Sequence, residues 1–332
     1  MADGANPRRA INGERLVVVW RVTTRCNLSC GFCAYDRSLP FPRHDTDEAS
    51  ALRWGESLAA LARERPGGVH VSFLGGEPLL WEPLGRVARH LVSLGLSLGI
   101  TSNGVGLARP ALRELVLDCF DELTLSIDGV GSRHDDVRGW PGGYQRLSTT
   151  ITEIASEKQR RGKGPRLRVN VVLMRENIGE FAELARAVAG LGVAELTFNR
   201  LGGRDRPEFF AAHRLEPDQL QRLERDLPKL RQELAHFGLS LRGGGAYLER
   251  LLSLERAEPV AVASCEPGQR FLFIDEHGRA APCSHTLERY GELAERSLSE
   301  LPRRFLARQR MTRAEVCDDC PSTQVFEKFE AS

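Results

Sequence analysis

The chain has 332 residues, of which 46 are Lys or Arg and 45 are Asp or Glu, so its formal net charge is +1. This balance argues against a dedicated nucleic-acid-binding protein, which usually carries a basic excess. No apolar run is long enough for a membrane-spanning helix, and the first residues lack the apolar core of a secretory signal. We therefore expect a cytoplasmic protein that binds neither nucleic acid nor membrane.

Strand-like apolar runs alternate with amphipathic helical patterns through about the first 200 residues. The strand-like runs are 16–22, 69–74, 96–102, 123–127, 167–174 and 195–198. Helical patterns fall at 47–65, 83–95, 110–119, 143–161 and 177–191. Such alternation predicts parallel strands with helices outside them, and six units are too few for a closed eight-stranded barrel. We expect an α/β fold, an open, partial (β/α)6 TIM-like barrel with its site at the carboxyl ends of the strands.

The rest of the chain divides into further parts. Residues 203–262 are mainly helical by pattern, with a charged helix at 216–237, and we assign them a connecting role. The last 70 residues contain four cysteines and one short apolar run, at 271–274. A segment this small is expected to need a metal site to hold it together. The predicted organisation is an N-terminal extension, a barrel, a helical connector and a small metal-binding domain, at residues 1–14, 15–202, 203–262 and 263–332.

Eight cysteines need an explanation, because structural disulfides are rare in a reducing cytosol and clustered thiols there usually bind metal. Cys26, Cys30 and Cys33 form a CxxxCxxC pattern after the first predicted strand. Thiolates at this spacing hold zinc or an iron–sulfur cluster, and three ligands with no fourth nearby suit a [4Fe–4S] cluster with one open iron. Cys119 stands alone in a helical pattern, and we expect it to be a structural cysteine.

Turn motifs end the next three predicted strands. They are Gly75-Gly76-Glu77-Pro78, TSNG at 101–104 and SIDG at 126–129, the last followed by HDDVRG at 134–139. In this order behind the cysteine triad, they resemble the radical S-adenosylmethionine (radical SAM) superfamily, and the resemblance covers most of the chain. It implies reductive cleavage of SAM at the open-iron cluster to a 5′-deoxyadenosyl radical, which removes a hydrogen atom from a substrate C–H bond.

The resemblance also implies roles for individual residues. The triad cysteines would ligate the cluster, and its open iron would bind the amino and carboxylate groups of SAM. Glu77 and the Gly75–Gly76 backbone would hold the ammonium group, because acceptors suit a cation. Ser126 and Arg138 are candidates for the carboxylate, since Arg offers a planar fork of donors. Near the adenine, the ribose or the methionine we expect Phe32, Asn103 and, on the fifth strand, Asn170.

A second set of cysteines lies near the end of the chain, at Cys265, Cys283, Cys317 and Cys320. A structural zinc site would also use four cysteines. The order of a cysteine, twelve residues, a glycine, four residues, a cysteine and then CxxC resembles the shortened twitch form of the SPASM auxiliary-cluster domain. That resemblance implies a second [4Fe–4S] cluster, saturated by four thiolates, which takes an electron from the substrate radical or relays one.

An auxiliary cluster permits net oxidation. We expect a radical SAM oxidoreductase that acts on a natural-product precursor such as a sugar, an aminocyclitol or a similar small molecule. The alternative is a maturase that introduces a crosslink, a thioether or an epimerisation into a ribosomally made peptide. A mere electron carrier would not need the turn motifs. Arg200, at the end of the sixth strand, is expected to point to the mouth of the barrel and is the candidate catalytic residue, and a flavodoxin or ferredoxin-type protein is the expected reductant.

Overall fold

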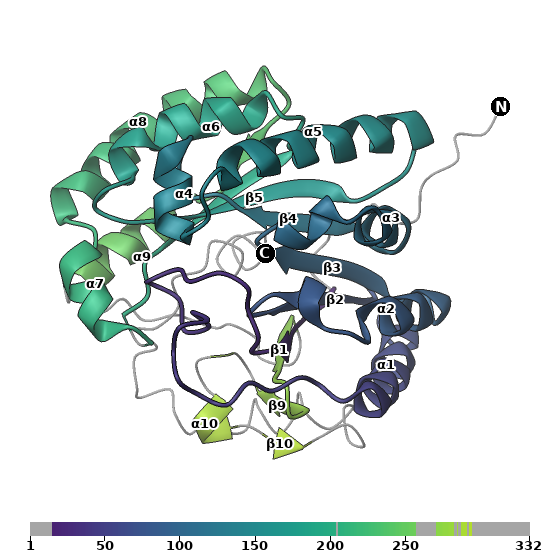
Figure 1. The fold of residues 1–332 in the computed structure, drawn as a ribbon. Coiled ribbons are helices and arrows are strands. Elements are labelled where there is room, and N and C mark those ends of the chain that lie inside the picture. The colour runs from purple at the N-terminus through teal and green to yellow at the C-terminus, as the bar shows by residue number, and fades with distance from the viewer. Residues whose placement is uncertain are drawn as a thin grey trace.

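The computed structural model describes residues 15–203, 205–256, 270–281, 284, 287–290 and 292–293. Within this part of the chain the strands form one sheet in the order β10-β9-β8-β1-β2-β3-β4-β5-β6-β7. Strands β1 to β6 are parallel neighbours in chain order, and they curve without closing into a ring (Figure 1). The predicted open, partial barrel is confirmed.

The barrel strands coincide closely with the six predicted runs. They are β1 (Leu16–Thr23), β2 (Val69–Gly75), β3 (Ser97–Ser102), β4 (Glu122–Ser126), β5 (Arg166–Leu173) and β6 (Glu195–Arg200). The helices on their outer side are α1 (Glu48–Arg63), α2 (Leu84–Ser93), α3 (Pro110–Cys119), α5 (Gly143–Arg161) and α6 (Phe181–Ala189) (Figure 1). The sequence patterns missed α4 (Ser132–Arg138), a short helix that lies between Gly131 and Gly139, both of which have positive φ angles.

The connector is mainly helical, as its pattern predicted. It contains α7 (Pro207–His213), α8 (Pro217–Ala235), β7 (Ser240–Leu241) and α9 (Gly245–Glu255). Helix α8 packs beside α6 and α9 and buries leucines at positions three and four residues apart. The short strand β7 pairs in parallel with β6 and so extends the sheet at that edge. Of the helices described here, none has the length and apolar character needed to cross a membrane.

The predicted run 271–274 forms β8 (Phe271–Ile274), which pairs in parallel with β1. Strand β9 (Arg279–Ala281) returns antiparallel to β8 and is followed by α10 (Leu287–Tyr290) and β10 (Glu292–Leu293). The first strand of the C-terminal segment therefore continues the barrel sheet. Cys265, Cys283, Cys317 and Cys320 lie outside the described residues, and the division of the chain at 202 and 262 stays a prediction.

The strands alternate between a buried, apolar outer face and a less buried inner face that carries polar side chains beside apolar ones such as Val19. In β1, Val18, Trp20 and Val22 are fully buried, and Trp20 packs edge-on against Trp54 of α1. Arg21 lies on the opposite face and is only partly buried. In β5, buried residues likewise alternate with less buried ones along the strand. Because side chains along a strand alternate between its two faces, the pattern lines the inside of the barrel with polar groups.

An aromatic cluster packs the outer face of the sheet against the helices. Phe73 lies at its centre, with ring centroids 6.0 Å from Trp20, 6.1 Å from Trp81 and 6.2 Å from Phe120. Its side chain is fully buried. Tilted and edge-on pairs at these distances add to the large apolar area that each ring buries. Phe73 thereby secures β2, the strand that carries the turn described below.

We predict that Phe73→Ala lowers the free energy of unfolding by about 3–5 kcal/mol, because it leaves a cavity among the three rings. Phe237→Ala is the matched control, since that side chain is 66% exposed. It should change the free energy of unfolding by less than about 0.5 kcal/mol. Urea unfolding of the two variants is the measurement, and losses of equal size would contradict this description of the core.

Candidate functional site

The three triad cysteines lie on the segment between β1 and α1, residues 24–47, which we call the cysteine loop. Cys30 is buried, with 4% of its surface exposed, and Cys26 and Cys33 are partly buried. The backbone N–H of Cys33 donates to the carbonyl of Cys30 at 2.9 Å, which closes a tight turn. Because the loop follows β1, it lies at the carboxyl ends of the parallel strands, where barrels of this kind place their sites.

Arg43 holds the cysteine loop from within. Its guanidinium donates to the carbonyls of Thr24, Tyr35, Asp36 and Leu39 at 2.6–3.2 Å. A loop that lacks regular structure must find partners for its backbone groups, and one arginine supplies donors for four of them. No motif marked Arg43 in the sequence, where it is one of many arginines without a distinctive spacing.

The glycine-rich turn after β2 is clasped to the start of the cysteine loop. The N–H of Gly76 donates to the carbonyl of Thr23 at 2.9 Å, and the N–H of Glu77 donates to the carbonyl of Arg25 at 2.7 Å. A Cβ atom on Gly75 or Gly76 would lie only 2.1 Å from the carbonyl oxygen of Thr23 or Arg25, respectively. The two backbones can approach this closely only because both residues are glycines.

Glu77 joins this turn to the one after β3. Its side chain is fully buried, and its carboxylate accepts hydrogen bonds from the N–H of Leu79 at 3.0 Å, the hydroxyl of Ser102 at 2.9 Å and the N–H of Asn103 at 2.7 Å. Burial raises the pKa of Glu77 to about 7, although these three donors oppose the shift. The carboxylate that was predicted to hold the SAM ammonium group is thus engaged with the protein itself.

Asn103 reaches the first cysteine from the β3 turn. Its side-chain nitrogen donates to the side-chain oxygen of Asn27 at 2.8 Å and lies 3.8 Å from the sulfur of Cys26. Its side-chain oxygen accepts from the N–H of Val105 at 3.0 Å, which fixes the orientation of the amide. The structure therefore brings Glu77, Asn103 and Cys26 together, as the order of the motifs predicts.

Arg138 approaches the loop from α4. Its Nε donates to the carboxylate of Asp128, in the SIDG turn, at 2.6 Å, and both side chains are buried. Burial alone would lower the pKa of Arg138, but the neighbouring Asp128 carboxylate raises it. The guanidinium lies 5.3 Å from the ring centroid of Phe32, and the Arg138 carbonyl lies 3.8 Å from the sulfur of Cys30. Arg138 and Phe32 thus meet beside the cysteine triad.

A row of polar side chains crosses the inner face of the sheet below the loop. Ser126 of β4 lies opposite Asn170 of β5. The side-chain oxygen of Asn170 accepts from Thr197 at 2.9 Å and from Asn199 at 3.1 Å, both on β6. No motif marks Thr197 or Asn199 in the sequence, although the alternation along β6 places both of them on the inner face.

Arg200 does not point into the mouth of the barrel. It leaves β6 on the side opposite Asn199, and its guanidinium pairs with the buried carboxylate of Glu255 on α9 at 3.1 Å. The same carboxylate binds Arg214 at 2.8 Å. Phe210 of α7 lies 5.7 Å from the Arg200 guanidinium. Arg200 therefore joins the connector to the barrel instead of pointing into its mouth, and its role in catalysis stays a prediction.

Helix α7 covers part of the cysteine loop, a contact that the sequence did not reveal. Phe209 packs on Gly31, where an added Cβ would lie 3.0 Å from its ring, and its centroid is 6.3 Å from that of Phe32. Arg206, just before α7, pairs with Asp36 at 3.4 Å. The loop is thereby held between the barrel and α7.

The thiols of the triad fit an iron–sulfur cluster. Burial raises the pKa of all three, and that of Cys33 to about 12. Such thiols stay protonated unless a metal replaces the proton. Among the described residues, no three His, Cys, Asp or Glu side chains converge as a single metal ion requires. A [4Fe–4S] cluster does not require this convergence, because each cysteine binds a different iron.

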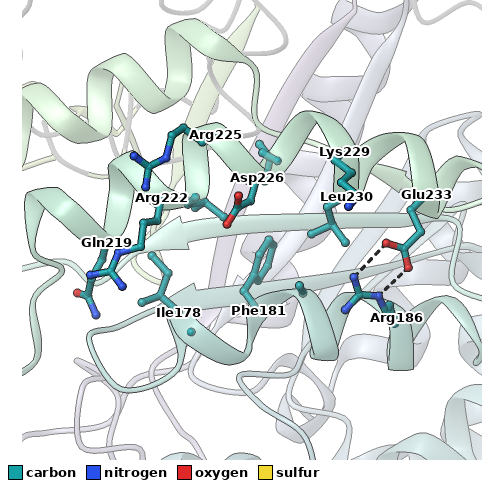
Figure 2. A pocket seen from close by; sticks show the side chains of 14 residues that line it. Ile178, Phe181, Arg186, Gln219, Arg222, Arg225, Asp226, Lys229, Leu230 and Glu233 are labelled. Atoms are coloured by element: carbon teal, nitrogen blue, oxygen red, sulfur yellow. Dashed lines mark hydrogen bonds and ion pairs between the residues drawn. The ribbon is translucent and has the colours of Figure 1, made fainter.

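A separate groove of about 560 Å³ lies between α6 and α8 (Figure 2). Phe181 and Leu230 contribute to its lining, and an ion pair between Arg186 and Glu233, at 2.6 Å and 3.0 Å, stands at one end. None of its lining residues belongs to the cysteine loop or to the turns after β2, β3 and β4. The groove is therefore not part of the candidate site.

Comparison with known proteins gives independent evidence on the family. A family model described as "Radical SAM superfamily" matches residues 20–188, just over half of the chain. The chain is 28% identical to pre-heme d1 synthase of Dinoroseobacter shibae over 59% of its length, which spans about half, 46%, of that relative. It is 27% identical to the PqqA peptide cyclase of Xanthomonas campestris, over 93% of this chain and 80% of the relative.

The fold is similar to that of SuiB from Streptococcus suis. The structure of SuiB bound to S-adenosylmethionine superposes with a TM-score of 0.65 at 16% identity, and the match covers 87% of this chain and 66% of SuiB. SuiB bound to the precursor peptide SuiA gives the same TM-score, with 64% of that chain covered. At this level of identity the likeness concerns the fold.

We predict that Gly76→Ala lowers the free energy of unfolding by about 3 kcal/mol or more and reduces the iron that the protein binds, since the methyl group forces the turn away from the cysteine loop. Gly179→Ala is the control, because its added Cβ meets nothing within 4 Å. Chemical unfolding and iron analysis after anaerobic reconstitution are the measurements. Normal stability and iron content in Gly76→Ala would show that the close approach is dispensable.

Proposed function

The chain belongs to the radical SAM superfamily, and on that premise we propose that it modifies a peptide substrate. It is an enzyme of this superfamily, which uses SAM and a [4Fe–4S] cluster. When bound, these cofactors supply a 5′-deoxyadenosyl radical that removes hydrogen from a C–H bond. The protein itself holds the cofactors, orients the substrate and keeps water away from the radical.

In the proposed site, Cys26, Cys30 and Cys33 ligate the cluster. Arg138 faces the SAM carboxylate, and its pairing with Asp128 keeps the guanidinium charged and fixed in direction. Phe32 lies beside Arg138 and supplies an apolar surface for the adenine. These assignments follow from the resemblance of the motifs. They are supported by the contacts that place the Arg138 guanidinium near the Phe32 ring and the Arg138 carbonyl near the sulfur of Cys30.

Three further residues act on the polar side of the same site. Asn103, directly after β3, provides hydrogen-bonding groups for the ribose or the methionine, and Ser126, the last residue of β4, provides a hydroxyl for the SAM carboxylate. Glu77 acts as a positioning residue, because its carboxylate already binds three donors of the protein. Contact with the ammonium group of SAM is then left to the backbone of Gly75 and Gly76.

A peptide substrate is favoured by one observation above the others. The similarity to PqqA peptide cyclase runs through 93% of this chain and 80% of that relative, so it includes the region beyond the barrel. The sequence alone favoured a sugar or an aminocyclitol, and neither of the two relatives named above bears a name of that kind. A heme-type small molecule is the second candidate, favoured by pre-heme d1 synthase and by the AdoMet-dependent heme synthase of Methanosarcina barkeri, which is 24% identical over 87% of this chain and 82% of its own length.

We further propose that Cys265, Cys283, Cys317 and Cys320 hold an auxiliary [4Fe–4S] cluster. Net oxidation requires that the substrate radical lose one electron and one proton, and a saturated cluster at this place would accept the electron. A flavodoxin or ferredoxin-type protein would supply the electron that starts the reaction. Both proposals rest on the cysteine pattern of the sequence.

We predict that the reconstituted, reduced protein releases 5′-deoxyadenosine from SAM and that Cys30→Ala lowers this release at least about 1,000-fold, because the variant lacks a ligand of the reactive cluster. Cys119→Ala is the matched control: Cys119 is partly buried at the end of α3, outside the triad, and its variant should keep the wild-type rate. Chromatography of the products measures both. Undiminished release from Cys30→Ala would place the chemistry elsewhere.

Substrate class is tested with peptides encoded by short reading frames beside the gene and, in parallel, with a porphyrin. We predict that one such peptide changes mass with SAM and reductant in D2O, where an epimerisation also shows as a gained deuterium, and that the porphyrin does not. Mass spectrometry of the peptide and 5′-deoxyadenosine formed per product are the measurements, with Cys30→Ala as the inactive control. Conversion of the porphyrin, with every peptide unchanged, would replace the peptide proposal by the second candidate.

A further inference from the structure

Arg21 lies inside the barrel and connects the cysteine loop to the antiparallel pair of β8 and β9, which we call the C-terminal hairpin. It projects from β1 on the inner face, and 17% of its side chain is exposed. Its Nε donates to the carboxylate of Glu276 at 2.5 Å, and its Nη1 donates to the hydroxyl of Tyr35 at 3.1 Å. We call Glu276, Arg21 and Tyr35 the Arg21 bridge.

The two ends of the Arg21 bridge lead to different cysteines. At one end, the backbone N–H of Tyr35 donates to the sulfur of Cys33 at 3.4 Å. At the other end, Glu276 lies in the turn between β8 and β9, seven positions before Cys283 in the sequence. One arginine thus stands between the third cysteine of the triad and the strand pair that leads toward the second cysteine set.

The turn that carries Glu276 is rigidly built. The carboxylate of Asp275 accepts hydrogen bonds from the N–H groups of His277 at 3.1 Å and Arg279 at 2.7 Å. Gly278 has a φ of 74° and meets Trp54 of α1, so that an added Cβ would lie 3.2 Å from the indole nitrogen. These contacts hold the turn between β8 and β9 together, so a displacement of the turn would carry Glu276 with it.

A second contact joins the same two segments. The rings of His44, in the cysteine loop, and His277, in the turn, lie with centroids 4.9 Å apart. The Arg21 bridge is the more buried of the two contacts, since 7% of the Glu276 side chain is exposed against 47% for His277. A buried ion pair that loses one partner leaves an uncompensated charge, so the bridge responds strongly to any change at Glu276.

We propose that Arg21 is a positioning residue that couples the β8–β9 turn to Cys33. A change in the C-terminal hairpin is carried by Glu276 to Arg21, from there to the Tyr35 hydroxyl, and by the Tyr35 backbone to the sulfur of Cys33. The inference rests on the proposed function only in taking Cys33 as a ligand of the reactive cluster. Coupling is reciprocal, so loosening the cysteine loop also loosens the turn.

The test uses the full-length, reconstituted protein and the variant Glu276→Gln, which keeps the shape of the side chain and removes its charge. Amide hydrogen exchange at residues 33–37 should become about tenfold faster, as expected when a buried, charge-assisted hydrogen bond is weakened. The SAM-dependent electron paramagnetic resonance signal of the reduced protein should also shift, because the surroundings of Cys33 change. A residue that only stabilised the fold would leave that signal where it is.

Glu122→Gln is the matched control. Glu122 also pairs with a partly buried arginine, Arg168, at 3.2 Å, but at the opposite end of the strands. The control should leave both the exchange at 33–37 and the resonance signal unchanged. Tyr35→Phe removes a single oxygen from the Arg21 bridge, so it should speed the same exchange and add little when combined with Glu276→Gln.

Unchanged exchange or an unchanged signal in Glu276→Gln would overturn the coupling, and so would equal effects in Glu122→Gln. If Glu276→Gln does not fold, Tyr35→Phe alone decides by the same two measurements. Release of 5′-deoxyadenosine is recorded in each preparation. Its absence from the wild type would overturn the proposed function, whereas the exchange comparison between variants decides the coupling by itself.

Discussion

The candidate site depends on a close approach of two backbones. The N–H of Gly76 meets the carbonyl of Thr23, and the next N–H meets that of Arg25, at distances that no Cβ on the turn would allow. These hydrogen bonds fix the start of the cysteine loop against the end of β2 and give these backbone groups their partners. With the turn held in place, Glu77 reaches the β3 turn and sets Asn103 beside the triad. The two glycines and Glu77 thus bring together the ends of β1, β2 and β3, which are far apart in sequence.

Three arginines contact the cysteine loop, one of them from within the loop, and each is bound by other groups of the same chain. Arg43 binds carbonyls within the loop, Arg138 pairs with Asp128, and Arg21 pairs with Glu276. Thiolate ligands carry negative charge, which nearby cations stabilise more strongly in a buried site than in water. The acids that hold two of these arginines also keep them pointing in fixed directions, so the cations are in place before a charged ligand arrives. Arg138 favours the thiolate forms of the triad, but burial outweighs it, so the thiols lose their protons when a metal replaces them.

Local patterns predicted most of the fold, because the alternation along each strand is itself local. They failed where the outcome depends on distant contacts or on a single residue. The run 271–274 is visible as a strand, but nothing near it reveals that it pairs with β1. Arg200 was expected to point to the mouth of the barrel, and its pairing with Glu255, which lies far along the chain, could not be seen from the residues around it. Arg43 lacks any motif, although it binds four carbonyls. The cysteines and turn motifs of the site were recognisable because their chemistry restricts both residue type and spacing, whereas no comparable restriction marks the substrate.

We propose that the cysteine loop holds a cluster with one open iron, at which SAM binds through its amino and carboxylate groups. The most direct measurement is electron–nuclear double resonance of the reduced protein with SAM that carries 15N in the amino group and 17O in the carboxylate. We expect hyperfine coupling of both nuclei to the cluster of the wild type, and loss of both couplings when Cys30 is replaced by Ala. A wild-type cluster that shows neither coupling, or a triad that holds zinc after anaerobic preparation, would contradict it.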